Sequence, residues 1–183
     1  GPAPPAGFAF APASPDLRPG ARREADAVTA GVAIWEGGPL DLPAVMRVME
    51  DSFDPAFGEA WTAPQCAGLL PMTGVWLSLA RRDEAVIGFA LGRIVRDEAE
   101  LLLLAVARSS QGKGVGQMLL DRFDAVAASK GAEQLHLEVR EGNHAVSLYS
   151  RNGYREVGRR RNYYNGRDGQ LFDALTLAKN SRA

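Results

Sequence analysis

The 183-residue chain has little of what disulfides, zinc sites and membrane spans require. Cys66 is its single cysteine, which excludes a disulfide within the chain and a four-cysteine zinc site. The two histidines, His136 and His144, do not have HExxH spacing and have no cysteine partners. No apolar run reaches the roughly 18–20 residues of a membrane span, and no signal peptide with a basic start and an apolar centre is visible. We therefore expect a cytoplasmic protein that holds no metal ion.

An excess of either charge is also missing. The chain has 21 Lys and Arg against 22 Asp and Glu, a formal net charge of −1. General binders of nucleic acid or of membrane surfaces usually carry a basic excess, so we expect neither partner. Arg159–Arg161 is a local basic run, typical of a solvated strand edge; the alternative is a contact with a substrate or a partner. A composition of 46% hydrophobic and 23% charged residues is that of a globular protein with a core.

The first 30 residues differ from the rest of the chain. They are rich in Pro, Ala and Gly, and their apolar residues follow neither a helical nor a strand period. Such a segment buries too little surface to offset the entropy lost on ordering, so we expect a flexible tail over residues 1–30. The alternative is an arm that orders on a partner. Residues 31–180 are long enough for one domain of ordinary size.

From Val32 onward, the apolar pattern alternates between strand and helix periods. The expected order is one strand, two helices, three strands, a helix, a strand, a helix and two strands, an α/β domain. Asp41 is expected to cap the first helix, and Asp83–Glu84 marks a hairpin. The expected strands are 32–35, 75–82, 85–95, 99–106, 135–139, 154–164 and 170–178, and the helices begin near 42, 64, 115 and 145.

A glycine-rich turn, Gln111–Gly116, lies between an apolar strand and an amphipathic helix. A helix N-terminus has unpaired amides and a partial positive charge, so it suits a pyrophosphate. A Walker loop needs Ser or Thr after Gly112–Lys113, where this chain has Gly114. A dinucleotide fingerprint needs a third glycine where Gln117 stands. What remains is QxxGxG, the acetyl-CoA pyrophosphate motif of the GNAT superfamily; the alternative is a glycine-rich turn without a function.

The chain resembles GNAT enzymes of the RimI type, bacterial N-terminal protein acetyltransferases, over roughly two thirds of its length. LEVR, followed by N…LY…GY and then RRxYY, is more specific than the turn alone. One departure is that NHAVSLY has one residue fewer between Asn143 and Tyr149 than family members commonly have. The blocks that carry the likeness are Glu59–Gln65, Ile87–Val106, Gln111–Gly116, Leu135–Tyr154, Arg160–Tyr164 and Phe172–Ala178.

The resemblance implies a GNAT fold, a central mixed, twisted sheet of about six to seven strands flanked by about four helices. It implies direct acetyl transfer from acetyl-CoA to the free α-amine of a protein, typically the N-terminus of a ribosomal protein such as one that begins with Ala or Ser. It assigns the general base to Glu138 and the general acid to Tyr149. The implied cofactor-binding residues are Leu104, Ala105, Val106, Gln111, Gly112, Lys113, Gly114, Val115, Gly116, Asn143 and Tyr149.

The chemistry explains why these residue types suit the reaction. An α-amine, with a reference pKa near 8, must lose a proton before it attacks a thioester, and a carboxylate can take it. Glu138 lies in an otherwise apolar strand, where partial burial would raise its pKa into a useful range. Backbone amides near Val106 can stabilise the oxyanion, and the Tyr149 phenol can protonate the leaving thiolate. Glu100 is a rival base in Ala99–Val106, and a strand salt bridge is its plainer role.

Several assignments have plain structural alternatives. Glu138 can be an outward-facing strand residue, and Tyr149 can be packing. Trp61, Tyr163 and Tyr164 are candidates for a substrate groove, and core or rim packing suits each equally well. Asn143 can cap its helix as well as contact the cofactor.

Two other functions remain open, an acetyltransferase for a small amine and a domain that binds acyl-CoA without turnover. The EAW block and the RRNYY block favour a peptide acceptor over a small amine. A complete QxxGxG, with Glu138 and Tyr149 both present, argues against a domain without turnover. We expect a monomer or a weak dimer.

Overall fold

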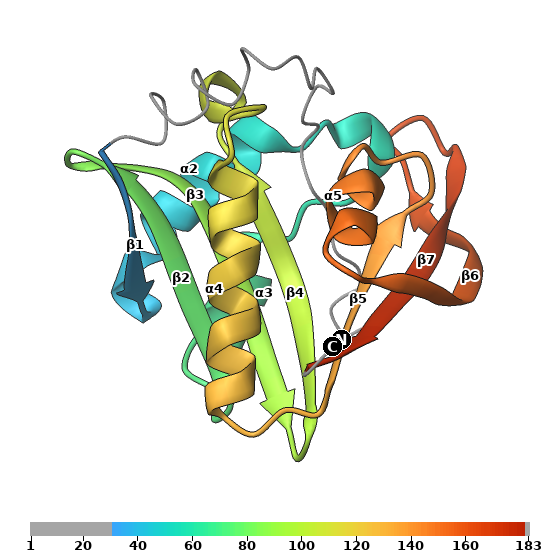
Figure 1. The fold of residues 1–183 in the computed structure, drawn as a ribbon. Coiled ribbons are helices and arrows are strands. Elements are labelled where there is room, and N and C mark those ends of the chain that lie inside the picture. The colour runs from blue at the N-terminus through green and yellow to red at the C-terminus, as the bar shows by residue number, and fades with distance from the viewer. Residues whose placement is uncertain (1–30, 182–183) are drawn as a thin grey trace, which may run out of the picture.

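One seven-stranded sheet organises the part of the chain that the computed structural model describes, residues 31–181 (Figure 1). The predicted tail, residues 1–30, lies outside the described residues. The strand order is β1-β2-β3-β4-β5-β7-β6, and the pair β4–β5 is parallel while the other pairs are antiparallel. The strands are β1 Val32–Gly37, β2 Val75–Arg82, β3 Ala85–Val95, β4 Glu98–Val106, β5 Gln134–Arg140, β6 Arg155–Asn165 and β7 Leu171–Asn180. The expected mixed sheet is therefore confirmed.

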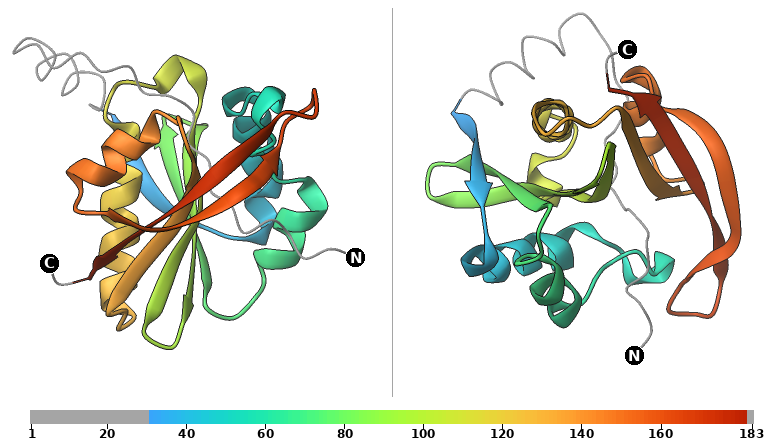
Figure 2. Two further views of the ribbon diagram at one scale, coloured as in Figure 1. Left: turned by 90° about the vertical axis from the view of Figure 1, so that its right-hand side faces the viewer. Right: turned by 90° about the horizontal axis from the view of Figure 1, so that it is seen from below.

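Helices cover both faces of the sheet. They are α2 Leu42–Ser52, α3 Ala63–Leu69, α4 Val115–Ser129 and α5 Ala145–Arg151, with short 3₁₀ turns at Pro39–Asp41 (η1), Pro55–Phe57 (η2) and Arg108–Ser110 (η3). Figure 2 shows α2 and α3 on one face and α4 on the other. The predicted order of strands and helices is confirmed. Within residues 31–181, no helix is long and apolar enough to cross a membrane.

The expected cap of α2 is wrong in one detail. Asp41 does precede the helix, but its carboxylate accepts a hydrogen bond from the Gly38 amide (2.9 Å) and none from the helix. The reason is the 3₁₀ turn η1, which places Gly38 within reach of the carboxylate first. By contrast, α3 has a full capping box, in which Thr62 Oγ1 and the Gln65 side chain each accept from the other's backbone amide.

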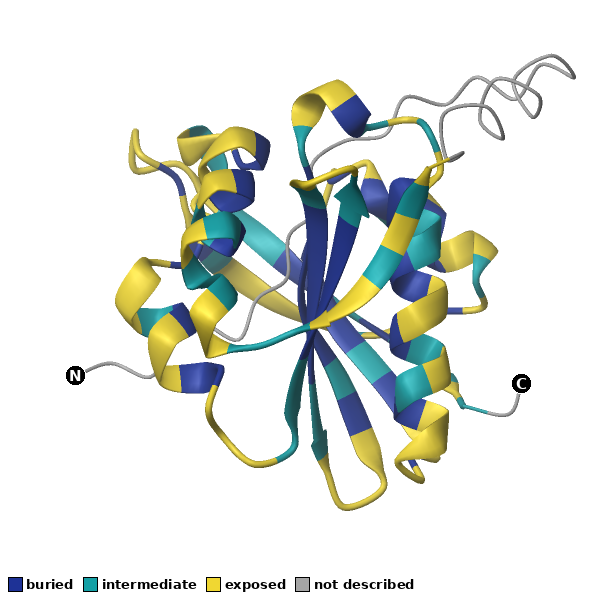
Figure 3. Cartoon of the chain, turned by 90° about the vertical axis from the view of Figure 1, so that its left-hand side faces the viewer, coloured by how far each residue is buried: buried dark blue, intermediate teal, exposed yellow. Residues whose placement is uncertain are grey.

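The core lies between the sheet and its helices, and the central strands are buried along most of their length (Figure 3). The Trp76 ring of β2 stacks on Phe123 of α4 at 5.5 Å between ring centroids. Gly92 of β3 makes this contact possible, because a Cβ at that position would lie 2.5 Å from the Trp76 ring. This packing fixes α4, and with it the glycine-rich turn, against the middle of the sheet.

Strands β4 and β5 separate halfway along their length (Figure 1). They pair only between Glu98–Leu101 and Gln134–Leu137. The register between β3 and β4 also shifts at Leu91/Gly92, which leaves Leu102 of β4 as the extra residue of a bulge. Beyond the bulge, no strand within residues 31–181 pairs with the edge of β4 that faces β5. The sheet thus opens between the end of β4 and the end of β5.

Candidate functional site

The opening between β4 and β5 brings together most of the predicted site residues. Leu104, Ala105 and Val106 are fully buried on β4 beyond its last pair with β5. Glu138 is the first β5 residue after that pairing ends. The glycine-rich turn follows β4 after η3, and Tyr149 comes from α5. Residues far apart in the sequence therefore meet at one break in the sheet.

The glycine-rich turn ends at the N-terminus of α4. Gly112 and Gly114 have φ values of 73° and 87°, and Gly114 is the N-cap. Positive φ at both positions explains why glycine is needed there. The amides of Val115 and Gly116 open the helix, where the first N–H groups have no intrahelical acceptor. The Lys113 ammonium donates to the Ser109 carbonyl (3.0 Å), which keeps its charge on the turn.

The end of β4 is held by side chains from both sides. The Gln111 amide donates to the Val106 carbonyl at 2.8 Å, and Ser52 Oγ lies between that carbonyl, at 2.9 Å, and the Val48 carbonyl of its own helix, at 2.5 Å. Since one link comes from the turn and the other from α2, the strand end, the turn and α2 are fixed relative to one another. Such fixed backbone is what a site built from main-chain donors needs.

Glu138 is a buried carboxylate with one engaged oxygen. Only 5% of the residue is exposed. Arg160 Nε lies 2.8 Å from Oε1, while Oε2 is buried without a hydrogen-bond partner among residues 31–181. Burial raises the pKa of Glu138 to about 7; Arg160 opposes the rise and Glu100 adds to it. The carboxyl therefore titrates near neutral pH, and its Oε2 has lone pairs available to accept a proton.

Glu100, the rival base, is engaged in a strand-to-strand contact. Arg93 of β3 donates to its Oε2 at 2.8 Å, and His136 Nε2 lies 3.9 Å from the same oxygen. Both partners are its register neighbours on β3 and β5. This is the plain strand salt bridge considered from the sequence.

Tyr149 places a phenol in the interior without a partner. The side chain is fully buried, and its hydroxyl makes no hydrogen bond to any described residue. The ring packs edge-on against Tyr154 at 5.9 Å between centroids. Burial, with a further contribution from the charge of Glu59, raises the pKa of the phenol above its usual value, so it stays protonated. A protonated phenol without an acceptor suits the role of hydrogen-bond or proton donor.

A buried cluster beside this phenol joins the predicted Asn143 to two residues that were not predicted as part of the site, Glu59 and Arg140. Glu59 pairs with the Arg140 guanidinium through Oε1 and accepts from the Asn143 amide through Oε2 at 3.0 Å. The Arg140 guanidinium also lies 3.9 Å from the centre of the Phe57 ring. Burial raises the pKa of Glu59 despite both partners. The residues stand in the EAW and LEVREGN blocks, but the sequence gives no sign that the two blocks touch.

Asn143 contacts the start of α5 from one residue before the N-cap, which is His144 and not Asn143 as one of its predicted roles required. Its side-chain oxygen accepts from the Ala145 amide at 2.9 Å, while its amide group donates to Glu59. Asn143 and Gln111 both line a hollow of about 430 Å³ at the open end of the sheet. The other lining residues are Ser52, Phe53, Asp54, Phe57, Glu59, Arg108, Arg140, Gly142 and His144.

The three predicted groove aromatics lie in different surroundings. Trp61 is 3% exposed and lines a hollow of about 650 Å³ with residues of α2, so it packs against the core while bordering open space. Tyr164 is buried and Tyr163 half-buried, with their ring centroids 5.2 Å apart. The Tyr163 ring also lies 5.2 Å from the guanidinium of Arg160, which links it to Glu138.

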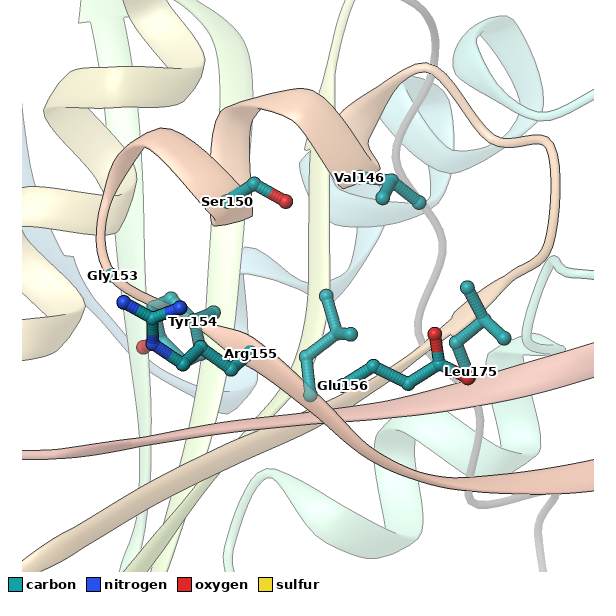
Figure 4. A pocket seen from close by; sticks show the side chains of 8 residues that line it. Val146, Ser150, Gly153, Tyr154, Arg155, Glu156 and Leu175 are labelled. Carbon is teal, nitrogen blue, oxygen red and sulfur yellow. The ribbon is translucent and has the colours of Figure 1, made fainter.

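A further hollow, of about 350 Å³, lies between α5 and strands β6 and β7 (Figure 4). It contains none of the predicted site residues, and its edges are the charged side chains of Arg155 and Glu156. The lining residues are Val146, Ser150, Gly153, Tyr154, Arg155, Glu156, Leu175 and Leu177.

The residues at the opening fit acetyl-CoA, the co-substrate that the resemblance implies. The glycines of the turn leave its backbone bare for a pyrophosphate at the α4 N-terminus. The unpaired edge of β4 offers main-chain groups for an amide-containing arm. The unpartnered hydroxyl of Tyr149 offers a donor at the inner end. Within residues 31–181 no group of three or more His, Cys, Asp or Glu is placed to hold a metal, and the expected absence of a metal stays a prediction.

Comparison with known proteins identifies relatives. The model of the acetyltransferase (GNAT) family matches residues 42–154. The chain is 41% identical over 96 residues to a [ribosomal protein bS18]-alanine N-acetyltransferase of Haemophilus influenzae, and 40% identical over 91 residues to the one of Escherichia coli K12. These alignments cover 52% and 49% of this chain, and 66% and 61% of the relatives. The chain thus matches less than two thirds of their length.

Solved structures give the same picture of the fold. The crystal structure of the ribosomal-protein-S18-alanine N-acetyltransferase from Escherichia coli superposes with a TM-score of 0.73 at 29% identity, covering 81% of this chain and 93% of that one. The structure of Ard1 from Thermoplasma volcanium gives 0.70 at 26% identity, covering 82% and 97%. PaiA N-acetyltransferase from Thermoplasma acidophilum, in complex with coenzyme A, shares the fold at 18% identity, covering 81% and 98%, with a TM-score of 0.65.

Proposed function

The chain belongs to the GNAT family of acetyltransferases, and we propose that it acetylates the free N-terminal amine of a protein, with acetyl-CoA as the donor. The observation that carries the proposal is the pair of polar atoms that are buried without a partner among the described residues, Glu138 Oε2 on β5 at the break in the sheet and Tyr149 Oη on α5. One is an acceptor and the other a donor. An amine acylation needs a group of each kind.

The residues of the opening would hold the co-substrate in a fixed orientation. The amides that follow Gly114 bind the pyrophosphate, and the unpaired edge of β4 near Ala105 binds the arm that carries the acetyl group. Acetyl-CoA supplies an acetyl group activated as a thioester. When the acetyl group joins the amine as an amide, the C–S bond breaks and coenzyme A leaves as a free thiol. Asn143 and Glu59 fix the start of α5 and so the position of Tyr149.

The proton movements are assigned to two side chains. Glu138 Oε2 takes the proton that the acceptor ammonium must lose, and its pKa of about 7 leaves a substantial ionised fraction at neutral pH. Tyr149 Oη holds the proton that offsets the negative charge left on the departing sulfur. Glu100 is the weaker candidate for the base because Arg93 already occupies its Oε2.

A protein N-terminus is preferred as the acceptor on two grounds. Curated relatives of about 40% identity are named for the alanine terminus of ribosomal protein bS18. The hollow beside Trp61 and the adjoining one that Glu59 lines give room for an extended peptide. We accordingly expect a ribosomal protein that begins with Ala or Ser, an enzyme of the cytoplasm, and a monomer or weak dimer. An acetyltransferase for a small amine is the second candidate, because the same turn and the same Glu138 would serve such an acceptor.

A thiol-release assay tests the proposal. Acetyl-CoA is offered with peptides that have a free Ala or Ser terminus, with blocked peptides that carry an internal lysine, and with spermidine and free amino acids. Turnover confined to free peptide termini is the expected result. Turnover on the small amines alone would favour the second candidate, and tight CoA binding without any turnover would indicate a binding domain.

A further inference from the structure

Arg160 touches the proposed base from one side only. Its Nε lies 2.8 Å from Oε1 of Glu138, and the Oε2 of the same carboxylate is buried without a partner in the described residues. The Arg160 side chain is 54% exposed, whereas that of Glu138 is 7% exposed. The guanidinium thus reaches inward from the surface to a carboxylate that solvent barely reaches.

The strand register allows the Arg160 side chain to extend from β6 across β7 to Glu138 on β5. Strand β7 lies between β5 and β6, and it places Thr176 opposite Glu138 and Ala174 opposite Arg160. Directly paired residues share a face of a sheet, as do residues two apart on one strand. The β7 side chains on the path from Arg160 to Glu138 are therefore small. The register breaks immediately after Arg160, which ends the regular pairing at this residue.

The neighbouring arginine has a different role. Arg159 donates to both carboxylate oxygens of Glu141, at 2.7 and 2.9 Å, and to Asp173 at 2.9 Å. All three are exposed or partly exposed side chains of the strand rim. The basic run therefore divides into a residue that ties the rim together and a residue directed at the site.

We propose that Arg160 is a positioning residue, which holds Glu138 by Oε1 so that Oε2 is presented to the acceptor amine. The inference rests on the proposed function. An arginine suits the task because its planar guanidinium stays charged and fixes the plane of the carboxylate that it contacts. Without it, the carboxylate can rotate and both oxygens compete for the incoming ammonium.

Removal of the Arg160 guanidinium changes the pKa of Glu138 in a defined direction. Two charged groups act on Glu138, Arg160 from β6 and Glu100 from β4. His136 and Arg140 lie two residues to either side of it on the same face of β5, where His136 is near Glu100 and Arg140 is paired to Glu59. Removal of the Arg160 cation disfavours the carboxylate, so the pKa of Glu138 rises by about one unit. Because the base must be ionised to act, the rise of kcat/KM with pH moves upward by the same amount.

The test compares Arg160→Gln with Arg160→Lys, with Arg161→Gln as the matched control at the exposed neighbour. The first measurement is the titration of Glu138 by ¹³C NMR of protein labelled at glutamate Cδ, assigned by the signal lost in Glu138→Gln. The second is the pH profile of kcat/KM on one free-terminus peptide. The titration of the acceptor amine is the same for every variant, so differences between profiles report the enzyme.

Arg160→Gln is expected to raise the Glu138 midpoint by about one unit and to lower kcat/KM at pH 7 about fivefold, with recovery at high pH. Arg160→Lys should recover the midpoint in part, and Arg161→Gln should change neither quantity. An unchanged midpoint in Arg160→Gln would overturn the positioning role. Absence of peptide turnover in the unaltered enzyme would instead contradict the proposed function, and the NMR titration would still decide whether Arg160 holds the carboxylate.

Discussion

At the scale of single residues, the site is defined by polar atoms that the fold buries and leaves unpaired. Glu138 Oε2 and Tyr149 Oη are two of the few such atoms within residues 31–181. A buried polar group without a partner costs about 1–3 kcal/mol. Their retention in a well-packed interior supports a role in binding or chemistry over a role in stability.

Glu138→Gln is expected to lower turnover by roughly 10²–10⁴ at neutral pH while leaving the affinity for CoA unchanged, because the amide cannot take a proton. Steady-state kinetics and calorimetry with CoA check the two parts. Glu100→Gln is the matched control, since its carboxylate already binds Arg93. If the control loses turnover and Glu138→Gln does not, the base is Glu100.

Tyr149→Phe is expected to separate activity from stability. It removes a buried hydroxyl that has no partner among the described residues, so the free energy of unfolding should rise by about 1 kcal/mol. Turnover should fall, because the donor is gone. Denaturant unfolding of the CoA-free protein measures the first effect. A loss of stability would mean that the hydroxyl has a partner after all.

The residue scale was also where the sequence was least informative. The alternation of Leu135–Val139 and the family likeness indicated Glu138. Glu59 was missed, because its role depends on Arg140 and Asn143, which lie far along the chain and meet it only after folding. No spacing rule relates such residues, so a contact between distant segments can be found only from the fold.

At the scale of elements, the turn Gln111–Gly116 and helix α4 act as one unit. The strand, the glycines and the helix period of α4 were all predictable from local pattern. The bulge at Leu102 and the early end of the β4–β5 pairing were not predictable, because β4 is a continuous apolar run and β5 alternates throughout, and neither pattern marks where pairing ends. Where the pairing of two strands ends depends on both strands, so the sequence of one strand alone does not specify it.

Gly114→Glu is expected to abolish CoA binding, because it places a carboxylate against the pyrophosphate at the N-cap of α4. Gly114→Gln is the matched control. Both side chains suffer the same strain at a φ of 87°, so the difference between them isolates the charge. Calorimetry with CoA measures each affinity. Equal affinities for the two variants would remove the cofactor from this turn.

At the scale of the whole molecule, the break in the sheet is held open by contacts between its two halves. Ser52 of α2 binds the end of β4, and Glu59 binds the end of β5 through Arg140. The overall α/β architecture followed from the order of predicted elements. The contacts by which α2 and the loop after it connect the two strands could not be predicted from that order, because they depend on side chains that only long-range packing buries.

Stability is expected to depend on pH through Glu138. Its pKa is about 7 in the folded state and near 4.5 as the reference value, so the folded state binds more protons between these values. The free energy of unfolding therefore falls as pH rises from about 5 to 8. Glu138→Gln removes this loss and should be more stable than the unaltered protein by about 3 kcal/mol at pH 8.

Denaturant unfolding at pH 5 and pH 8 measures the effect, with Glu98→Gln as a control at an exposed position of β4. The control should follow the unaltered protein at both values. A stability difference between Glu138→Gln and the unaltered protein that does not change with pH would show that the carboxyl titrates normally.

The central claim is that the opening between β4 and β5 acetylates a protein N-terminus with Glu138 as the base. The most direct test is mass spectrometry of a peptide with a free N-terminal alanine and an internal lysine, after incubation with acetyl-CoA and either the unaltered enzyme or Glu138→Gln. The account predicts one acetyl group on the alanine nitrogen, formed at least a hundredfold more slowly by the variant, on the order of the contribution of a general base. Acetylation of the lysine, or equal rates for both proteins, would contradict it.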